Sequence, residues 1–213
     1  MINKFNNAND AFEYLYLYIN EHGINFDNTK AIFNCGFNIQ NPMDNLIKTK
    51  WRKWSKSYAD LEWEWYLSAE ESAQRVAEKA KIWKTIMDEN GNVNSNYGYQ
   101  WQRNNQLDKV IDILRKNPNT RKASISLYDG KEIDKYTRDT ICTYAINFTQ
   151  LNNKLNMSVM MRSNDLWYGL CNDQYCFSKL MELVSKELNY EIGEYYHFVV
   201  NLHIYNEFLN KNK

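Results

Sequence analysis

Apolar residues in the first half of the chain recur with the spacing of α-helices. One such segment covers residues 9–19 and ends at Gly23, and a longer one covers residues 58–87. The longer segment is followed by an Asn-Gly pair at residues 90–91, which commonly closes a helix or forms a tight turn. A third helix is expected over residues 106–115. The first half of the chain is therefore predicted to be helical.

The second half alternates apolar and polar residues with the two-residue period of β-strands. The alternation is short over residues 123–127 and clearer over 142–148 and 155–161, with residues 152–154 as the turn of a hairpin. Four residues of the middle strand are then expected to share one face of the sheet: Cys142, Tyr144, Ile146 and Phe148.

An amphipathic helix is predicted over residues 173–189, and a last strand over residues 196–205. Helices followed by strands, one more helix and a final strand indicate an α+β domain, with a sheet largely covered on one face by helices. The 213 residues contain two prolines, seven glycines, no linker and no repeat, which leaves no obvious domain boundary. We therefore expect a single domain over residues 1–213.

Charge and cysteine content narrow the function classes. The 26 basic and 26 acidic residues cancel, and no basic block stands apart, so duplex nucleic acid is not an expected partner. No apolar run reaches membrane-spanning length and the N-terminus does not resemble a signal peptide, which predicts a cytosolic protein with no membrane partner. Four cysteines without a CxxC pair and three histidines supply a closed zinc site poorly, so we expect reduced thiols and no metal.

Cys142 is the first candidate for chemistry, because it begins a predicted strand just after a polar and charged loop. A small buried cysteine is the usual explanation for such a residue. Functional sites lie more often at strand ends than at strand centres, however, and a nearby Arg162 or Arg121 would stabilise a thiolate. A cluster of polar side chains follows Arg162, which predicts either a loop that cradles an anion or an ordinary polar turn.

Asp173 is the second candidate. It stands directly before the apolar run of the predicted 173–189 helix, and in most proteins an acidic residue there is simply the N-cap. From the local pattern alone, the N-cap is the first explanation for this residue.

Several segments of the chain resemble, in this order, the thymidylate synthase family and its deoxycytidylate hydroxymethylase branch from phages. They span roughly residues 58–205, and an ordered set is far more specific than a single motif. The segments are LEWEWYL (61–67), KIW (81–83), NSNYGYQW (94–101), NPNTRK (117–122), DTICTYAINF (139–148), MRSNDLWYGLCND (161–173) and HFVVNLHIY (197–205).

The resemblance implies a thymidylate synthase-like fold, a mixed sheet, and a homodimer formed through that sheet. It implies that Cys142 attacks C6 of a pyrimidine nucleotide, which makes C5 nucleophilic enough to take a one-carbon unit from methylenetetrahydrofolate. Arg162 and Ser163 would then hold the 5′-phosphate, and Arg121 with Lys122 would reach the same phosphate from the partner subunit. The family has two arginines at this last position, so Lys122 removes one planar guanidinium while the charge stays.

The resemblance also assigns the other site residues. His203 and Tyr205 match the groups that bind the deoxyribose 3′-hydroxyl, and Asn164 belongs with the substrate-binding residues. Glu62 matches the carboxylate that organises proton transfer through water, and Tyr97 a hydroxyl in the same network. Three positions match the lining of the folate site: Ile82, Trp83 and Asp165.

At the position of Asp173, thymidylate synthases have an asparagine whose amide faces O4 and N3–H of uracil. An ionised carboxylate cannot donate to O4, but it accepts from the C4 amino group of cytosine, and from N3 if that nitrogen is protonated. A carboxylate can do this and still cap a helix with its second oxygen. Ile141-Cys142-Thr143 stands where thymidylate synthases generally have Pro-Cys-His, a second departure in the same direction.

The expected activity is hydroxymethylation of dCMP, with tetrahydrofolate as the second product. The alternatives are a thymidylate synthase-like or dCMP methylase activity, and a member of the family that has lost catalysis. The chain ends eight residues after Tyr205, so the segment that closes over folate in thymidylate synthases is expected to be absent. The many Asn, Lys and Ile residues, with the resemblance, suggest a bacteriophage enzyme of nucleotide biosynthesis for modified DNA, acting in the cytoplasm of an infected bacterium.

Overall fold

A twisted sheet of seven strands runs through the part of the chain that the computed structural model describes, residues 3–131 and 138–212. Its order is β1-β3-β7-β6-β5-β4, with β2 paired to β3 at one edge. The pairs β1–β3 and β6–β7 are parallel and the others antiparallel, so the sheet is mixed. The strands are β1 (Asn3–Phe5), β2 (Ile24–Phe26), β3 (Thr29–Ile39), β4 (Ser124–Ser126), β5 (Thr143–Leu151), β6 (Lys154–Asp165) and β7 (Glu191–Tyr205).

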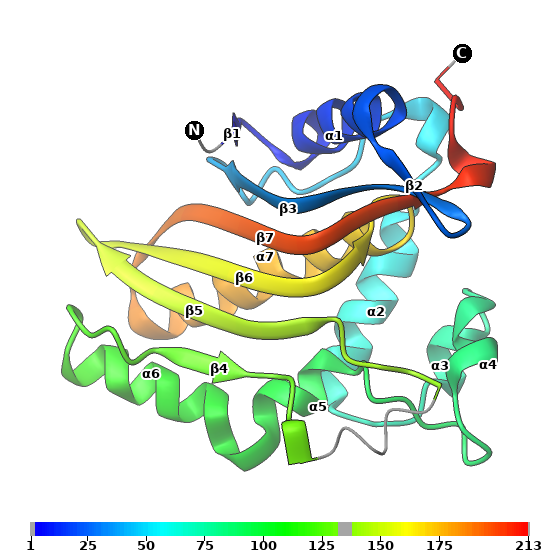
Figure 1. Cartoon of the computed structure of the whole chain (residues 1–213). Helices are drawn as coiled ribbons and strands as arrows, with labels where there is room; N and C mark the ends of the chain where they lie inside the picture. Colours follow the sequence, from blue (N-terminus) through cyan, green and yellow to red (C-terminus); the bar gives the residue numbers. More distant parts are fainter. Residues whose placement is uncertain (1–2, 132–137, 213) are drawn as a thin grey trace.

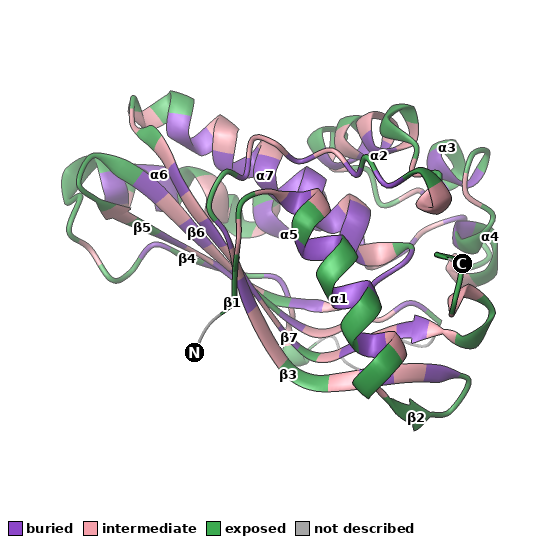
Figure 2. Ribbon diagram, turned by 90° about the horizontal axis from the view of Figure 1, so that it is seen from above, coloured by how far each residue is buried: buried purple, intermediate pink, exposed green. Residues whose placement is uncertain are grey.

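The helices lie on one face of this sheet (Figure 1), and the view from above shows the two layers (Figure 2). The α-helices are α1 (Ala8–His22), α2 (Lys56–Ser68), α3 (Gln74–Ala77), α4 (Ile82–Ile86), α5 (Tyr97–Gln102), α6 (Gln106–Lys116) and α7 (Gly169–Leu188). Short 3-10 turns cover Lys50–Arg52, Arg103–Asn105 and Asn206–Phe208. The predicted α+β class, with helices over one face of a mixed sheet, is confirmed.

The core lies between the two layers, because each element buries one face. Along β7 the buried residues alternate from Gly193 to Val199, and the buried stripe of α7 includes Phe177 and Leu180. Trp65 of α2 and Trp101 of α5 are both fully buried, so the two helices join the same core.

The predicted helix over residues 58–87 is wrong as a single element. Helix α2 ends at Ser68, and its C-cap Ala69 takes a left-handed conformation with φ of 55°. Helices α3 and α4 follow as separate short elements, and Gly91 forms the predicted turn with φ of +82°. The break turns the chain so that α4 packs beside α2, where Trp83 meets Trp65 with ring centroids 5.1 Å apart.

The expectation that Cys142, Tyr144, Ile146 and Phe148 share one face is also wrong. The β5–β6 register shifts between Thr143 and Ala145, so one extra residue breaks the alternation. Tyr144 is 41% exposed, whereas Ile146 and Phe148 are buried against the helices. The bulge lies at Tyr144, two residues after Cys142, at the start of the strand.

Three further boundaries differ from the prediction. Strand β6 extends to Asp165, so the polar cluster after Arg162 belongs to the strand and not to a loop. Helix α7 begins at Gly169 with Tyr168 as N-cap, so the N-cap explanation of Asp173 is wrong. Strand β3 was not predicted, because Asn34 in a left-handed conformation interrupts its alternation.

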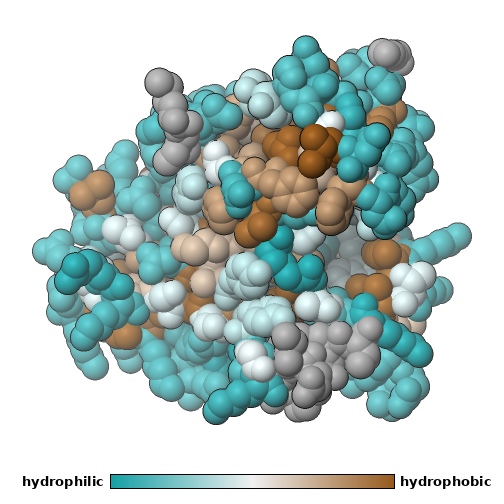
Figure 3. Space-filling model, in the orientation of Figure 1, coloured by the Kyte–Doolittle hydropathy of each residue, from teal (hydrophilic) through white to brown (hydrophobic). Residues whose placement is uncertain are grey.

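The opposite face of the sheet carries exposed apolar side chains. Figure 3 shows hydrophobic residues gathered on the face seen in Figure 1, over the upper strands of the sheet. The exposed large residues of these strands include Ile24, Phe26, Phe33 and Val200. No described helix is long and apolar enough to cross a membrane.

Candidate active site

Cys142 and Arg162 lie side by side where β5 and β6 pair. Arg162 Nη2 is 3.4 Å from Cys142 Sγ and donates to Thr140 O at 2.8 Å, and Arg162 Nε donates to Ile141 O at 3.0 Å. The backbone N–H of Arg162 also donates to Cys142 O at 2.8 Å. The guanidinium is therefore held against the segment that carries the thiol, as the sequence suggested.

Burial controls the charge of this thiol. It raises the pKa of Cys142 to about 11, and the positive charge of Arg162 opposes the shift while Asp173 and Asp139 add to it. In the free protein at neutral pH, Cys142 is therefore a thiol, because the effect of burial outweighs the stabilisation of the thiolate by Arg162. Nucleophilic attack requires the proton to leave as the bond forms.

A hollow of about 180 Å³ lies beside the ends of β6 and β7. Ser163, His203 and Tyr205 line it, as do residues 26–29 and Asn201. Asn201 Oδ1 and His203 Nδ1 are buried and have no hydrogen-bond partner in the described part of the chain. Buried polar atoms are normally paired, so this hollow is suited to a polar ligand.

Glu62 of α2 is 5% exposed, and both of its carboxylate oxygens are bound. Tyr66 OH donates to Oε1 at 3.0 Å and Asn172 Nδ2 donates to Oε2 at 3.1 Å. Burial raises the pKa of Glu62 to about 7, against hydrogen bonds that lower it. A carboxyl group with a pKa near neutrality can both accept and return a proton.

Tyr97 begins α5, and local contacts fix its position. The N-cap Asn96 accepts from Tyr99 N at 2.9 Å and donates to Trp65 O at 3.1 Å, which ties α5 to α2. Gly98 allows the close approach, because a Cβ there would lie 1.6 Å from Tyr66 O. Burial raises the pKa of Tyr97 well above its ordinary value, with Asp173 and Cys142 adding to the shift, so the phenol stays neutral.

Asp173 lies one turn into α7 and is 8% exposed. Asn164 Nδ2 donates to its Oδ2 at 2.6 Å, and Asn164 Oδ1 is buried with no described partner. Gly169, one turn earlier, leaves room for the carboxyl group, since a Cβ there would lie 3.2 Å from Asp173 Oδ2. Burial raises the pKa of Asp173 to about 8, and the charge of Glu62 adds to the shift.

The three residues expected to line a folate site differ in exposure. Asp165 accepts from Trp167 N at 3.0 Å and Tyr168 N at 2.9 Å, which leaves other lone pairs of its carboxylate for a ligand. Ile82 is 55% exposed, whereas Trp83 is nearly buried and donates to Tyr58 OH at 2.7 Å. Ile82 offers an exposed apolar side chain and Asp165 a carboxylate acceptor, two kinds of contact that a flat heterocycle with N–H donors can use.

Arg121 and Lys122 are not brought into this site by a contact within the chain. Both are exposed on the segment between α6 and β4. Their predicted partner is the phosphate site of a second subunit, and that role stays a prediction.

Some residues at the site were missed by sequence reasoning. Tyr66 follows Glu62 by four residues, so the helical spacing could have revealed it. Asn172 contacts Glu62 across 110 residues of sequence, and no local pattern signals such a contact. Asp139 accepts from Ser95 N at 2.7 Å and Ser95 Oγ at 2.6 Å, which anchors the segment before Cys142.

The fold and the site define a class of protein: an α+β enzyme with a partly buried thiol, a guanidinium beside it and two buried carboxyl groups of raised pKa. Perturbed groups of this kind cluster at catalytic sites. In the described part of the chain, no group of three or more His, Cys, Asp or Glu side chains could hold a metal ion.

Comparison with known proteins identifies the family. The family model for thymidylate synthase matches residues 21–213, and the chain belongs to this family. It is 24% identical over 194 residues to a thymidylate synthase of Bacillus mojavensis, covering 87% of this chain and 69% of the relative. A thymidylate synthase of Bacillus phage phi3T is 23% identical over 194 residues, with the same coverage of 87% and 69%. Thymidylate synthase 1 of Bacillus amyloliquefaciens is 25% identical over 177 residues, covering 79% and 76%.

Membership of this family confirms three predictions. Its enzymes transfer a one-carbon unit, use methylenetetrahydrofolate as co-substrate, and bind a pyrimidine nucleotide, typically as dimers. The thymidylate synthase fold that the sequence motifs predicted is confirmed with them. The relatives named above are all thymidylate synthases.

Proposed function

We propose that this protein is a deoxycytidylate hydroxymethyltransferase, which places the one-carbon unit of methylenetetrahydrofolate on C5 of dCMP and completes it with water. The single observation that carries the proposal is Asp173, a buried carboxyl group inside α7 that caps no helix. A helix cap would have explained an acidic residue here without any ligand.

Asp173 supports cytosine because of its hydrogen-bonding capacity. The carboxyl group and N3 of cytosine share one proton, which forms one hydrogen bond between them. A carboxyl oxygen accepts a second hydrogen bond from the C4 amino group. The raised pKa of Asp173, about 8, supplies that proton at neutral pH. Uracil already carries its own proton on N3, so O4 is matched only while the carboxyl group keeps its proton, and the ionised carboxylate meets O4 with repulsion.

The covalent step is assigned to Cys142. Its sulfur adds to C6, its proton leaves, and the electron pair moves to C5, which attacks the methylene carbon that folate supplies. Arg162, 3.4 Å from the sulfur, would stabilise negative charge as the proton leaves. Glu62 and Tyr97 would then move the C5 proton through water.

Water is the proposed nucleophile for the last step. Loss of the C5 proton and departure of the folate leave an exocyclic methylene on the base, and hydroxide adds to it while a proton passes to Glu62. The sulfur then leaves C6. This outcome is supported by the polar surroundings of Glu62, where Asn172 and Tyr66 bind the carboxylate. Hydride transfer requires a site from which water is excluded.

The remaining assignments complete the nucleotide and folate sites. Arg162 and Ser163 would hold the phosphate, with Arg121 and Lys122 of the partner subunit, while Asn164 fixes Asp173. His203 and Tyr205 would bind the sugar, which is supported by the hollow that both side chains line. Ile82, Trp83 and Asp165 would hold the folate. A homodimer through the bare sheet face is supported by its exposed apolar residues.

The second candidate is a methylating enzyme, acting on dUMP as thymidylate synthase does or on dCMP. It is favoured by the names of the relatives, which are thymidylate synthases at 23 to 25% identity. It shares every residue role up to the exocyclic methylene, so it differs in the base and in the final nucleophile. A family member without catalysis is the third possibility, and it is opposed by the intact set of thiol, guanidinium and buried carboxyl groups.

Release of tritium from C5 tests the base. The protein is incubated with methylenetetrahydrofolate and either dCMP or dUMP labelled at C5, and tritium in water is counted. Faster release from dCMP is expected. Release only from dUMP would contradict the cytosine assignment, and release from neither would leave the inactive family member.

A further inference from the structure

The Glu62 carboxylate accepts a hydrogen bond from a residue with no assigned role. Asn172 Nδ2 donates to Glu62 Oε2 at 3.1 Å, and Trp54 Nε1 donates to Asn172 Oδ1 at 2.7 Å. An indole N–H can only donate, so it binds the amide oxygen and turns the NH₂ group towards Glu62. Trp54 therefore fixes the orientation of the Asn172 amide.

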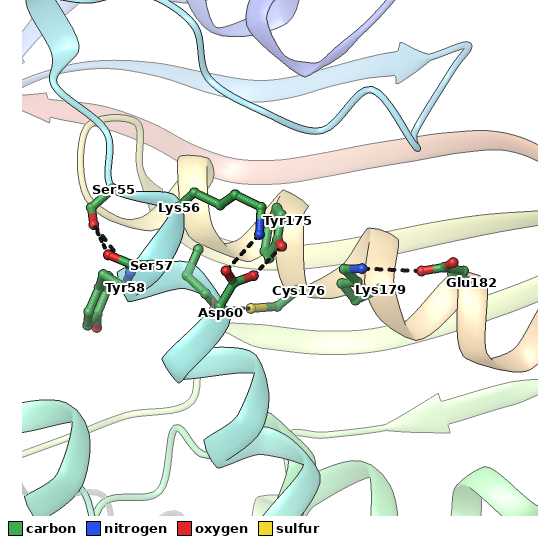
Figure 4. A network of polar contacts seen from close by, with 10 residues as sticks. Ser55, Lys56, Ser57, Tyr58, Asp60, Tyr175, Cys176, Lys179 and Glu182 are labelled. Atoms are coloured by element: carbon green, nitrogen blue, oxygen red, sulfur yellow. Dashed lines mark hydrogen bonds and ion pairs between the residues drawn. The ribbon is translucent and has the colours of Figure 1, made fainter.

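Polar contacts between α2 and α7 hold this arrangement in place. Asp60 accepts from Lys56 Nζ at 2.7 Å and from Tyr175 OH at 2.5 Å, and these groups converge between the two helices (Figure 4). The Trp54 ring packs against the Tyr175 ring, with centroids 5.6 Å apart. Glu62 on α2 and Asn172 on α7 thus face each other across a fixed contact.

Asn172 and Asp173 are consecutive residues of α7 with different partners. Asp173 is bound by Asn164 of β6, whereas Asn172 reaches α2. One turn of helix therefore carries both the group proposed to hold the base and the group that holds the proton-transfer carboxylate.

We propose that Asn172 is a positioning residue, which fixes the orientation of the Glu62 carboxylate and stabilises its ionised form while Glu62 moves protons in the reaction. The inference rests on the proposed function, since it gives Glu62 a proton-transfer role. The contact itself is independent of which base or nucleophile the enzyme uses.

The ionisable groups around Glu62 explain why the hydrogen bond from Asn172 should affect the pKa of Glu62. Tyr58 and Tyr66 on its own helix and Asp173 and Cys176 on α7 are the ionisable groups that interact with it. None of these supplies a positive charge, so the ionised carboxylate depends on neutral donors. Asn172 is one of those donors, and its removal should raise the pKa of Glu62.

The test replaces Asn172 by leucine, which has similar shape and no donor. Gln174→Leu is the matched control, because Gln174 is a buried amide on the same turn that donates to Asn45 O at 2.8 Å and Cys171 O at 3.0 Å. Trp54→Phe is the second variant, which keeps an aromatic ring but frees the Asn172 amide to turn. The carboxyl carbons of glutamate are labelled and titrated by NMR, with Glu62→Gln to assign the signal.

Asn172→Leu should raise the pKa of Glu62 by about one unit, and Trp54→Phe should raise it by less. The acidic limb of kcat against pH should move upward by the same amount, so that kcat at pH 6 falls up to about tenfold while KM for the nucleotide stays within about twofold. Gln174→Leu should leave both midpoints in place.

Unchanged Glu62 midpoints in Asn172→Leu and Trp54→Phe would overturn the inference. A KM that rises while the kcat profile stays fixed would also overturn it, since it would assign Asn172 to binding. The NMR titration needs no turnover, so a wild-type protein that converts no pyrimidine nucleotide would contradict the proposed function while the Asn172 contact is still decided.

Discussion

Asp173→Asn is the substitution that tests how the base is read. The Asn164 Nδ2 donor, 2.6 Å from Asp173 Oδ2, should keep an oxygen at that place in the variant. The new NH₂ group is then directed to the other side, towards the base. It can donate to O4 of uracil, but it opposes the C4 amino group of cytosine, which leaves two buried donors without acceptors.

The size of the effect follows from burial, since residue 173 is only 8% exposed. An unpaired buried donor costs about 1 to 3 kcal/mol. A factor of ten corresponds to about 1.4 kcal/mol, so the ratio of kcat/KM for dCMP over that for dUMP should fall about tenfold or more. Competition between the two nucleotides in one reaction measures this ratio directly, and an unchanged ratio would refute the role of Asp173 in reading the base.

The same substitution has a second effect, on the stability of the free protein. The folded state raises the pKa of Asp173 to about 8, from about 3.9 in an unfolded chain. The folded protein then binds more protons than the unfolded chain between these values, and the contribution of Asp173, complete below about pH 4, is lost as the pH rises through about 8. Asp173→Asn should therefore raise Tm at pH 8, with a difference that shrinks towards pH 4. If the variant is less stable than wild type at pH 8, ionisation of the Asp173 carboxyl group does not lower the free energy of unfolding, which would contradict this prediction.

Further substitutions test the nucleophile and the shared site. Cys142→Ala should abolish turnover while nucleotide binding, measured by calorimetry, persists, and Cys35→Ala should retain turnover; near-normal activity of Cys142→Ala would rule out the covalent step. If Arg121 completes the phosphate site of the partner, mixing Arg121→Ala chains with Cys142→Ala chains should restore partial activity through hybrid dimers. No rescue after verified subunit exchange would count against a shared site. Glu62→Gln should slow tritium release from C5 of the nucleotide by about 100-fold or more, as expected for a lost acid–base group, and equal release would remove Glu62 from proton transfer.

The sequence predicted the class of fold and the family because long periodic segments and ordered motifs can be recognised without knowledge of tertiary contacts. The boundaries that it missed are those set by tertiary contacts. Helix α2 ends at Ser68 although the apolar period continues, since the chain must turn back for α4 to pack Trp83 against Trp65. The bulge at Tyr144 likewise depends on pairing with β6 and not on local propensity.

The candidate site shows the same division. The sequence motifs identified Cys142, Arg162 and Asp173 as candidates. In the structure, Arg162 Nη2 lies 3.4 Å from Cys142 Sγ. The charge states were less accessible, because burial dominates them and burial is a property of the whole fold. The role of Asn172 could not be found from the sequence, because its two partners are far away along the chain. Glu62 lies on α2, and Trp54 lies in the segment before α2.

The identity of the nucleotide product tests the proposed hydroxymethylation of dCMP directly. The enzyme, methylenetetrahydrofolate and dCMP are incubated in water labelled with heavy oxygen, and the nucleotide is analysed by mass spectrometry while absorbance follows dihydrofolate. A hydroxymethyltransferase should give 5-hydroxymethyl-dCMP that carries one labelled oxygen, with no dihydrofolate formed. A methylated nucleotide without label, formed together with an equal amount of dihydrofolate, would contradict the proposed hydroxymethylation.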